Sequence, residues 1–174
     1  MLMELPASFD PYRAANAKER ISGQFDSRGL QRLQQSVLHM GDGPLDVDLA
    51  FSTDAVGRSY LKGRVSLQVE LECQRCMQAM QHLLCADLDL VLLRSEAQME
   101  RYEGESEAII IGDDGLDLQV AIEDELILAL PIIAMHDETE CQPWRDETEL
   151  EQTENEAEPE RENPFAMLAQ LKKD

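Results

Sequence analysis

Four side chains in this sequence are of the types that bind a transition metal. Cys73 and Cys76 are separated by two residues, and His136 and Cys141 lie much later in the chain, separated by four. Two thiolates at the first spacing, on a chain reversal, can both contact one tetrahedral zinc ion at about 2.3 Å. His136 and Cys141 complete four ligands if the fold brings both segments to the same end of a domain.

The same cysteines allow two further interpretations. Cys73 and Cys76 can be reduced structural thiols, which is the usual state of cysteines in a reducing compartment. They can also form a redox pair. The sequence therefore indicates zinc as the candidate cofactor and leaves these two alternatives open.

A buried carboxylate is the second feature with chemical consequences. A run of three acidic residues, 123–125, interrupts the apolar segment 118–130. On a helix, Glu125 lies within the apolar stripe formed by Leu118, Ile122, Leu126 and Ala129. If this stripe faces a sheet, Glu125 is buried and needs a cationic partner, for which Arg75 and Arg94 are the nearest candidates by topology.

The alternative is that Val120, Ile127 and Leu128 mark the buried face, which leaves all three acidic residues in water. Neither version favours acid–base catalysis. Asp124 and Glu125 point about 100° apart on a helix, so their carboxylates do not converge on one bond.

Strands are predicted between and around these residues. Apolar and polar residues alternate over 45–51, 60–71 and 82–93, which is the period of strands that bury one face. Short turns join these strands, which predicts an antiparallel meander with one wet face. Residues 108–111 add a short apolar strand.

Helix signals complete an α+β fold in which a main helix packs on the sheet. Asp10 and Pro11 are typical of an N-cap followed by the first helical residue, and Ser27 is expected to cap a second short helix over 30–38. The main helix is expected to follow Asp117 and to end before Pro131.

Three regions are predicted along the 174 residues. Residues 1–144 form a single α+β domain, and residues 145–162 form a flexible acidic linker that is too polar to order. Residues 163–174 form a short C-terminal anchor helix. Its apolar face can fold back on the domain or bind a partner, through Phe165, Leu168 and Leu171.

The charge balance limits the classes of partner. There are 36 acidic and 15 basic residues, for a formal net charge of -21. A protein that binds RNA phosphates over a broad surface needs a basic face. The negative net charge of this chain instead repels polyanions and attracts polycations. The absence of a signal peptide pattern, the lack of a long apolar segment and the four cysteines indicate a cytoplasmic protein without a membrane partner.

Several segments together resemble the YceD family of large ribosomal RNA subunit accumulation proteins. They are Leu5-Pro6 with Asp10-Pro11, Leu71–Cys76, Val120–Pro131, His136-Asp137 with Cys141, and Asn163–Lys172. The resemblance implies a role in the synthesis, processing or stability of 23S rRNA, in large-subunit assembly, and no enzymatic activity. Many relatives carry a fuller cysteine set after the main helix, where this chain has His136 and Cys141.

Three kinds of function follow from these observations. The first is a module that contacts 23S rRNA or a precursor particle, and the second is an acidic chaperone for a basic ribosomal protein. The third is an enzyme, which is disfavoured because the sequence has no phosphate-binding glycine loop, catalytic triad or usable carboxylate cluster. No small-molecule substrate is indicated.

Overall fold

The computed structural model describes residues 2, 4, 5, 10–112, 114–137 and 139–141, all of which belong to one compact unit, Met1–Gln142. The predicted linker at 145–162 and the predicted C-terminal helix at 163–174, with Phe165, Leu168 and Leu171, lie outside the described residues.

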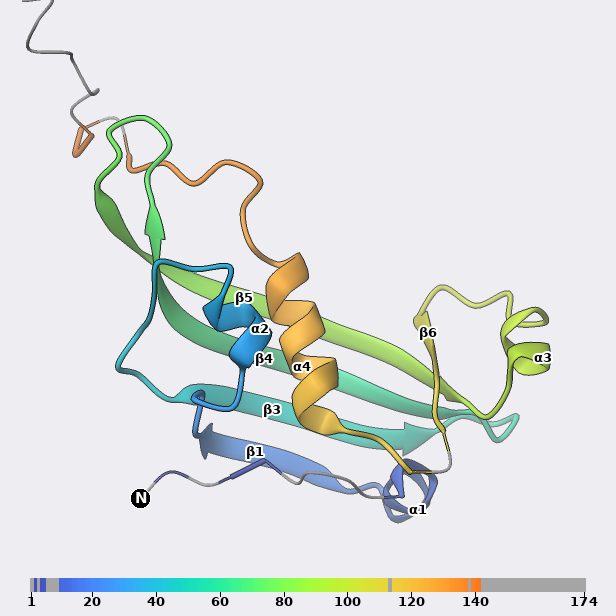
Figure 1. Ribbon diagram of the computed structural model, residues 1–174. Coiled ribbons are helices and arrows are strands. Elements are labelled where there is room, and N and C mark those ends of the chain that lie inside the picture. Colours follow the sequence, from blue (N-terminus) through green and yellow to red (C-terminus); the bar gives the residue numbers. More distant parts are fainter. Residues whose placement is uncertain (1, 3, 6–9, 113, 138, 142–174) are drawn as a thin grey trace, which may run out of the picture. The chain divides into compact units, whose positions relative to one another are not determined.

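The described residues form an α+β fold, as predicted. In chain order the elements are α1 (Pro11–Ala17), β1 (Arg20–Phe25), α2 (Gln31–Gln34), β2 (His39–Met40), β3 (Leu45–Thr53), β4 (Ser59–Glu72), β5 (Ala79–Leu93), α3 (Glu96–Met99), β6 (Glu107–Ile110) and α4 (Leu118–Leu128). Figure 1 shows α4 lying across one face of the sheet, with α2 beside it.

The sheet is mixed and mostly antiparallel. Its strand order is β1-β3-β4-β5-β6, and the short β2 pairs with β4. The pairs β1–β3, β3–β4 and β4–β5 are antiparallel, but β6 runs parallel to β5. A parallel neighbour needs a crossover connection, which the segment containing α3 supplies between β5 and β6. The three strands predicted to be antiparallel, β3, β4 and β5, are so, and the strand predicted at 108–111 adds a parallel edge to the sheet.

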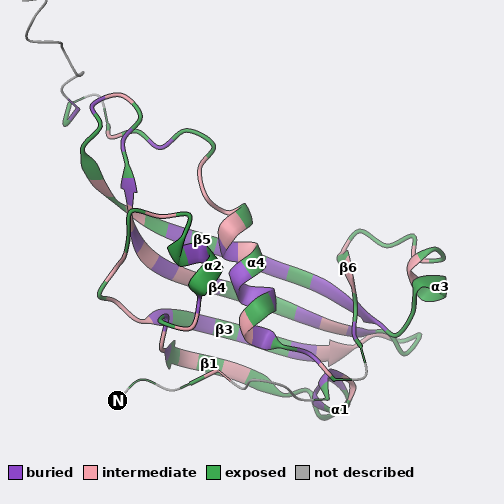
Figure 2. Cartoon of the chain, in the orientation of Figure 1, coloured by how far each residue is buried: buried purple, intermediate pink, exposed green. Residues whose placement is uncertain are grey.

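Alternation of apolar residues places the core between the sheet and α4. In β3, the residues Leu45, Val47, Leu49 and Phe51 are buried and their neighbours are not. The same alternation continues in β4 and β5 (Figure 2). The predicted period-2 pattern is confirmed in β3, in β4 and in β5 as far as Leu90, whereas Val91 and Leu93 at the end of β5 are buried as well. The other face of the sheet carries the cross-strand ion pairs Arg20–Asp48, Lys62–Asp89 and Arg64–Asp87.

The helix caps are confirmed at α1 and α4 and wrong at α2. Asp10 Oδ1 accepts hydrogen bonds from the backbone N–H groups of Tyr12 and Arg13, and Asp117 Oδ1 accepts one from Val120. The helix α2 spans only one turn, and its N-cap residue is Leu30, which gives no side-chain hydrogen bond. Ser27 therefore does not cap it. No helix in the described part of the chain is long and apolar enough to span a membrane.

Candidate metal centre

The turn between β4 and β5 brings Cys73 and Cys76 together. The Cys73 N–H donates to the Gln78 carbonyl at 2.9 Å, and the Met77 N–H donates to the Cys73 carbonyl at 2.8 Å. Met77 adopts a left-handed conformation with φ of 58°. Met77 thus takes the backbone position that glycine adopts most easily, and the reversal closes without a glycine.

The chain after α4 runs back to this turn, as Figure 1 shows. The Gln74 N–H donates to the Ala134 carbonyl at 2.8 Å. The His136 N–H donates to Cys73 Sγ at 3.4 Å, and a turn follows in which the Cys141 N–H donates to the Asp137 carbonyl at 3.1 Å. These backbone contacts hold the segment that carries His136 and Cys141 against the cysteine turn.

The four predicted ligands converge on one point. The distance between Cys73 Sγ and Cys141 Sγ is 3.7 Å, and the distance between Cys76 Sγ and His136 Nδ1 is 3.4 Å. All four ligand atoms lie within 4.8 Å of one another. Two sulfurs bound to one tetrahedral zinc at about 2.3 Å lie about 3.8 Å apart, so the observed spacing fits such an ion.

The surroundings of the cluster favour the thiolate at Cys73 and the neutral thiol at Cys76. The three cysteines are buried and His136 is half-buried. Burial raises the pKa of the Cys73 thiol, but the backbone N–H groups of His136, Arg75 and Cys76 outweigh it and lower that pKa from 9.0 to about 5. Burial raises the pKa of Cys76. A set of three thiols and one imidazole fills a tetrahedral site, which is typical of a structural centre and leaves no open position for catalysis.

Arg75 belongs to this cluster and not to the main helix. Its Nε donates to Cys141 Sγ at 2.9 Å, and its guanidinium also donates to the His136 carbonyl at 3.1 Å. A cation in this position offsets the negative charge that three thiolates bring to a zinc ion. The expected pairing of Arg75 with Glu125 is therefore wrong. Cys85 lies exposed on β5, outside the cluster.

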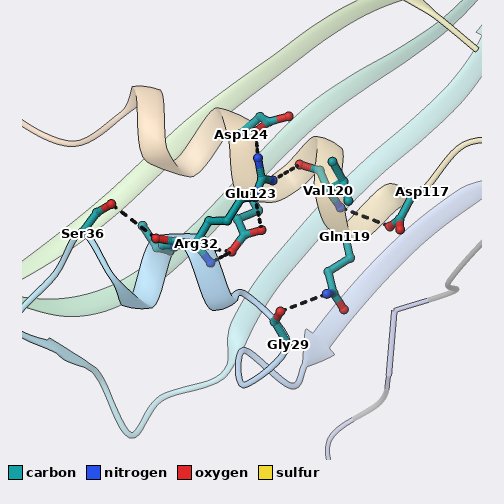
Figure 3. Close-up of polar contacts among 9 residues, drawn as sticks. Gly29, Arg32, Ser36, Asp117, Gln119, Val120, Glu123 and Asp124 are labelled. Atoms are coloured by element: carbon teal, nitrogen blue, oxygen red, sulfur yellow. Dashed lines mark hydrogen bonds and ion pairs between the residues drawn. The ribbon is translucent and has the colours of Figure 1, made fainter.

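The buried carboxylate of α4 is Glu123 rather than Glu125. The Glu123 side chain is 5% exposed and forms an ion pair with Arg32, whose Nε lies 2.8 Å from Oε2. Glu123 Oε1 also accepts the backbone N–H groups of Arg32 at 2.6 Å and of Leu33 at 3.0 Å (Figure 3). These N–H groups are in the first turn of α2, so Glu123 supplies the cap that Leu30 lacks.

The apolar face predicted for the main helix is confirmed in α4. The sequence did not show that α2 packs beside this face. Leu118, Ile122 and Leu126 are buried, whereas Val120 and Leu128 are 43% and 72% exposed, so the alternative face is wrong. Because α2 packs on one flank of α4, the flanking Glu123 is covered. Glu125 is half-buried with its pKa raised by burial and then by Glu107 and Asp124, and it makes no ion pair within the described residues.

Comparison with known proteins assigns the family. The sequence model of the large ribosomal RNA subunit accumulation protein YceD matches residues 61–172, a range that includes both halves of the cluster. The large ribosomal RNA subunit accumulation protein YceD of Haemophilus influenzae is 32% identical over 171 residues, which cover 98% of this chain and 97% of that protein. The chain belongs to the YceD family. No solved structure matches it.

Membership of the YceD family confirms the resemblance seen in the sequence. The structure brings together all four predicted metal ligands of this YceD-family chain. Sequence reasoning missed the pair formed by Arg32 and Glu123, since 91 positions separate them and no local pattern links the two. One signal was present: the start of α2 has no capping side chain of its own, so its N–H groups need an acceptor from elsewhere.

Replacing Glu123 by alanine is expected to lower the free energy of unfolding by about 2 to 4 kcal/mol, because two N–H groups of α2 lose their acceptor. The matched control is Glu125→Ala, on the same helix, which is expected to change that free energy by less than about 1 kcal/mol. Urea unfolding followed by circular dichroism measures both. A loss at Glu125→Ala equal to or larger than that at Glu123→Ala would contradict this assignment.

Proposed function

We propose that this chain is a non-catalytic accessory factor for large ribosomal subunit RNA, acting in the cytoplasm in the synthesis, processing or stability of 23S rRNA and in large-subunit assembly. The observation that carries the proposal is the family match over residues 61–172, together with similarity over nearly the full length of a protein named for large ribosomal RNA subunit accumulation. Its partner on this pathway is a 23S rRNA precursor particle.

The non-catalytic part of the proposal rests on how the reactive side chains are used. The four candidate metal ligands fill a tetrahedral set, so a bound ion has no free position for water or substrate. Glu123 and Asp124 are both paired with Arg32. Glu123 and Asp124 therefore serve packing between helices rather than proton transfer.

Zinc is the cofactor that this donor set favours. Three thiolates and an imidazole suit zinc better than the hard cations, which prefer oxygen ligands. Cys73, Cys76, His136 and Cys141 would hold the ion. A bound zinc ion would crosslink the turn after β4 to the segment after α4, and so stabilise the position of α4 on the sheet.

A second candidate function is that of an acidic chaperone for a basic ribosomal protein. The net charge of -21 favours it, since a basic protein would be attracted and bare RNA repelled. Apolar side chains are also exposed after α4, with Ile132 at 96% and Ile133 at 57%. Residues Phe165, Leu168 and Leu171 stay predicted partner-binding residues for either function.

Loss of the chain in its host is expected to lower the amount of 23S rRNA relative to 16S rRNA, because the proposed role is specific to the large subunit. Quantifying both RNAs in a deletion strain, with and without the chain supplied in trans, measures this ratio. A deletion strain with an unchanged ratio would overturn the proposed function.

The two candidate partners are separated by affinity capture at rising salt. If the chain is a chaperone, the captured material is one or a few basic proteins, and it is released as the Debye length falls from about 8 Å at 0.15 M to about 3 Å at 1 M salt. If the chain contacts precursor particles, 23S rRNA is captured in preparations free of nuclease. Triple replacement of Phe165, Leu168 and Leu171 by serine is expected to reduce capture in either case.

The purified full-length chain is expected to contain close to one zinc ion per molecule, and Cys73→Ser is expected to abolish binding because a three-ligand site holds zinc more weakly. Cys85→Ser is the matched control and should retain the metal. Elemental analysis gives the metal content, and thermal unfolding with and without a chelator gives the stabilisation. A metal-free chain whose Tm does not respond to added zinc would refute the zinc proposal.

A further inference from the structure

A pocket of about 340 Å³ lies at the end of the sheet opposite to the cysteine cluster. It is lined by residues of α1, the turn before β4, the end of β5, and α3 with the residues that follow it. Figure 1 shows α1 and α3 at this end of the sheet, while the turn after β4 lies at the other. The pocket is close to the lower limit of about 300 Å³ for small-ligand sites.

The lining of this pocket is opposite in charge to the rest of the molecule. Three arginines, Arg58, Arg94 and Arg101, line it, and among the described residues no aspartate or glutamate does. The whole chain has 36 acidic and only 15 basic residues. An all-cationic lining is therefore a local exception to a strongly anionic surface, and it favours an anionic ligand.

Two of these arginines have no carboxylate partner among the described residues. Arg58 is paired with Asp54, as most described basic residues are paired with a carboxylate. Arg94 and Arg101 form no ion pair with any described residue. Their guanidinium groups retain hydrogen-bond donors in the planar geometry that matches phosphate oxygens.

Two tyrosines make the pocket aromatic as well as cationic. The Arg94 guanidinium lies over the Tyr12 ring at 3.6 Å from its centroid, and Arg58 lies over the Tyr102 ring at 5.8 Å. The Tyr12 hydroxyl is buried and has no hydrogen-bond partner in the described part of the chain. The pocket therefore combines positive charge with flat ring surfaces.

We infer that this arginine–tyrosine pocket binds one unpaired nucleotide of single-stranded RNA. Arg94 and Arg101 contact its phosphate, and the base stacks on the flat surfaces that the tyrosine rings and guanidinium planes offer. Single-stranded RNA is recognised elsewhere by this combination of stacking and arginine contacts. The inference rests on the proposed function for the presence of RNA, and it assigns the direct contact to one local pocket instead of a broad basic face.

The test measures binding of a fluorescein-labelled, unstructured ten-nucleotide RNA to the full-length chain by fluorescence anisotropy. The double variant Arg94→Gln with Arg101→Gln is expected to weaken binding by at least about tenfold. The matched control, Lys18→Gln with Arg28→Gln, removes the same charge from exposed positions outside the pocket and should change the Kd by less than about twofold. Neutralisation of one phosphate predicts a shallow salt dependence, with a slope of log K against log salt concentration of about -0.7.

Three results would overturn the inference. They are equal weakening by the two double variants, equal binding of an abasic strand of the same length, and no binding of the ten-nucleotide RNA at 50 mM salt. If the pocket double variant does not fold, Arg101→Gln alone replaces it and should weaken binding about threefold or more, since the Arg101 side chain forms no hydrogen bond or ion pair with the described residues.

Failure of this inference can be told apart from failure of the proposed function. A chain that binds no RNA, but whose deletion lowers the ratio of 23S to 16S rRNA, would lose the pocket assignment and keep the pathway role. An unchanged ratio would remove the pathway role whatever the anisotropy shows.

Discussion

Two segments that are about sixty positions apart meet at one end of the β4–β5 hairpin, and the placement of α4 depends on that meeting. The Gln74 N–H bonds to Ala134, and the His136 N–H bonds to Cys73 Sγ. In the chain, α4 follows β6, which is paired with β5, and precedes the segment that contacts the cysteine turn. Both ends of α4 are therefore attached to the sheet. At its flank, Glu123 adds a third constraint by capping α2.

Most basic side chains named above are paired with an acceptor from another part of the fold. On the wet face of the sheet, basic residues are paired with aspartates across neighbouring strands. Arg32 forms an ion pair with Glu123 between α2 and α4, and Arg75 donates a hydrogen bond to Cys141 at the cysteine cluster. Arg94 and Arg101 are left at the far pocket without a carboxylate partner among the described residues. An anionic body can thus keep one cationic position for a ligand that its overall charge would repel.

Sequence patterns predicted what depends on local chemistry. Strand alternation in β3, β4 and β5 follows from burial of one face, and the caps Asp10 and Asp117 follow from the needs of a helix start. The four candidate metal ligands were predictable because residue type and spacing restrict a tetrahedral site. The parallel β6 was not predictable, because strand direction depends on how the segment around α3 crosses the sheet.

The choice between Glu123 and Glu125 shows where sequence reasoning ends. A helical projection locates the stripe that faces the sheet, but not which flank a second helix covers. Here α2 covers the flank of Glu123, and Arg32 comes with it. The arginine–tyrosine pocket at the far end of the sheet is lined by residues from α1, the turn before β4, the end of β5 and the region of α3. No single sequence motif therefore predicts it.

We propose that three thiolates and one imidazole bind a single zinc ion, which would hold the segment after α4 against the hairpin. X-ray absorption at the zinc edge of the purified, zinc-loaded chain measures this coordination directly. The account predicts three sulfurs at about 2.3 Å and one nitrogen at about 2.0 Å. A shell dominated by oxygen, or one with fewer than three sulfurs, would contradict it.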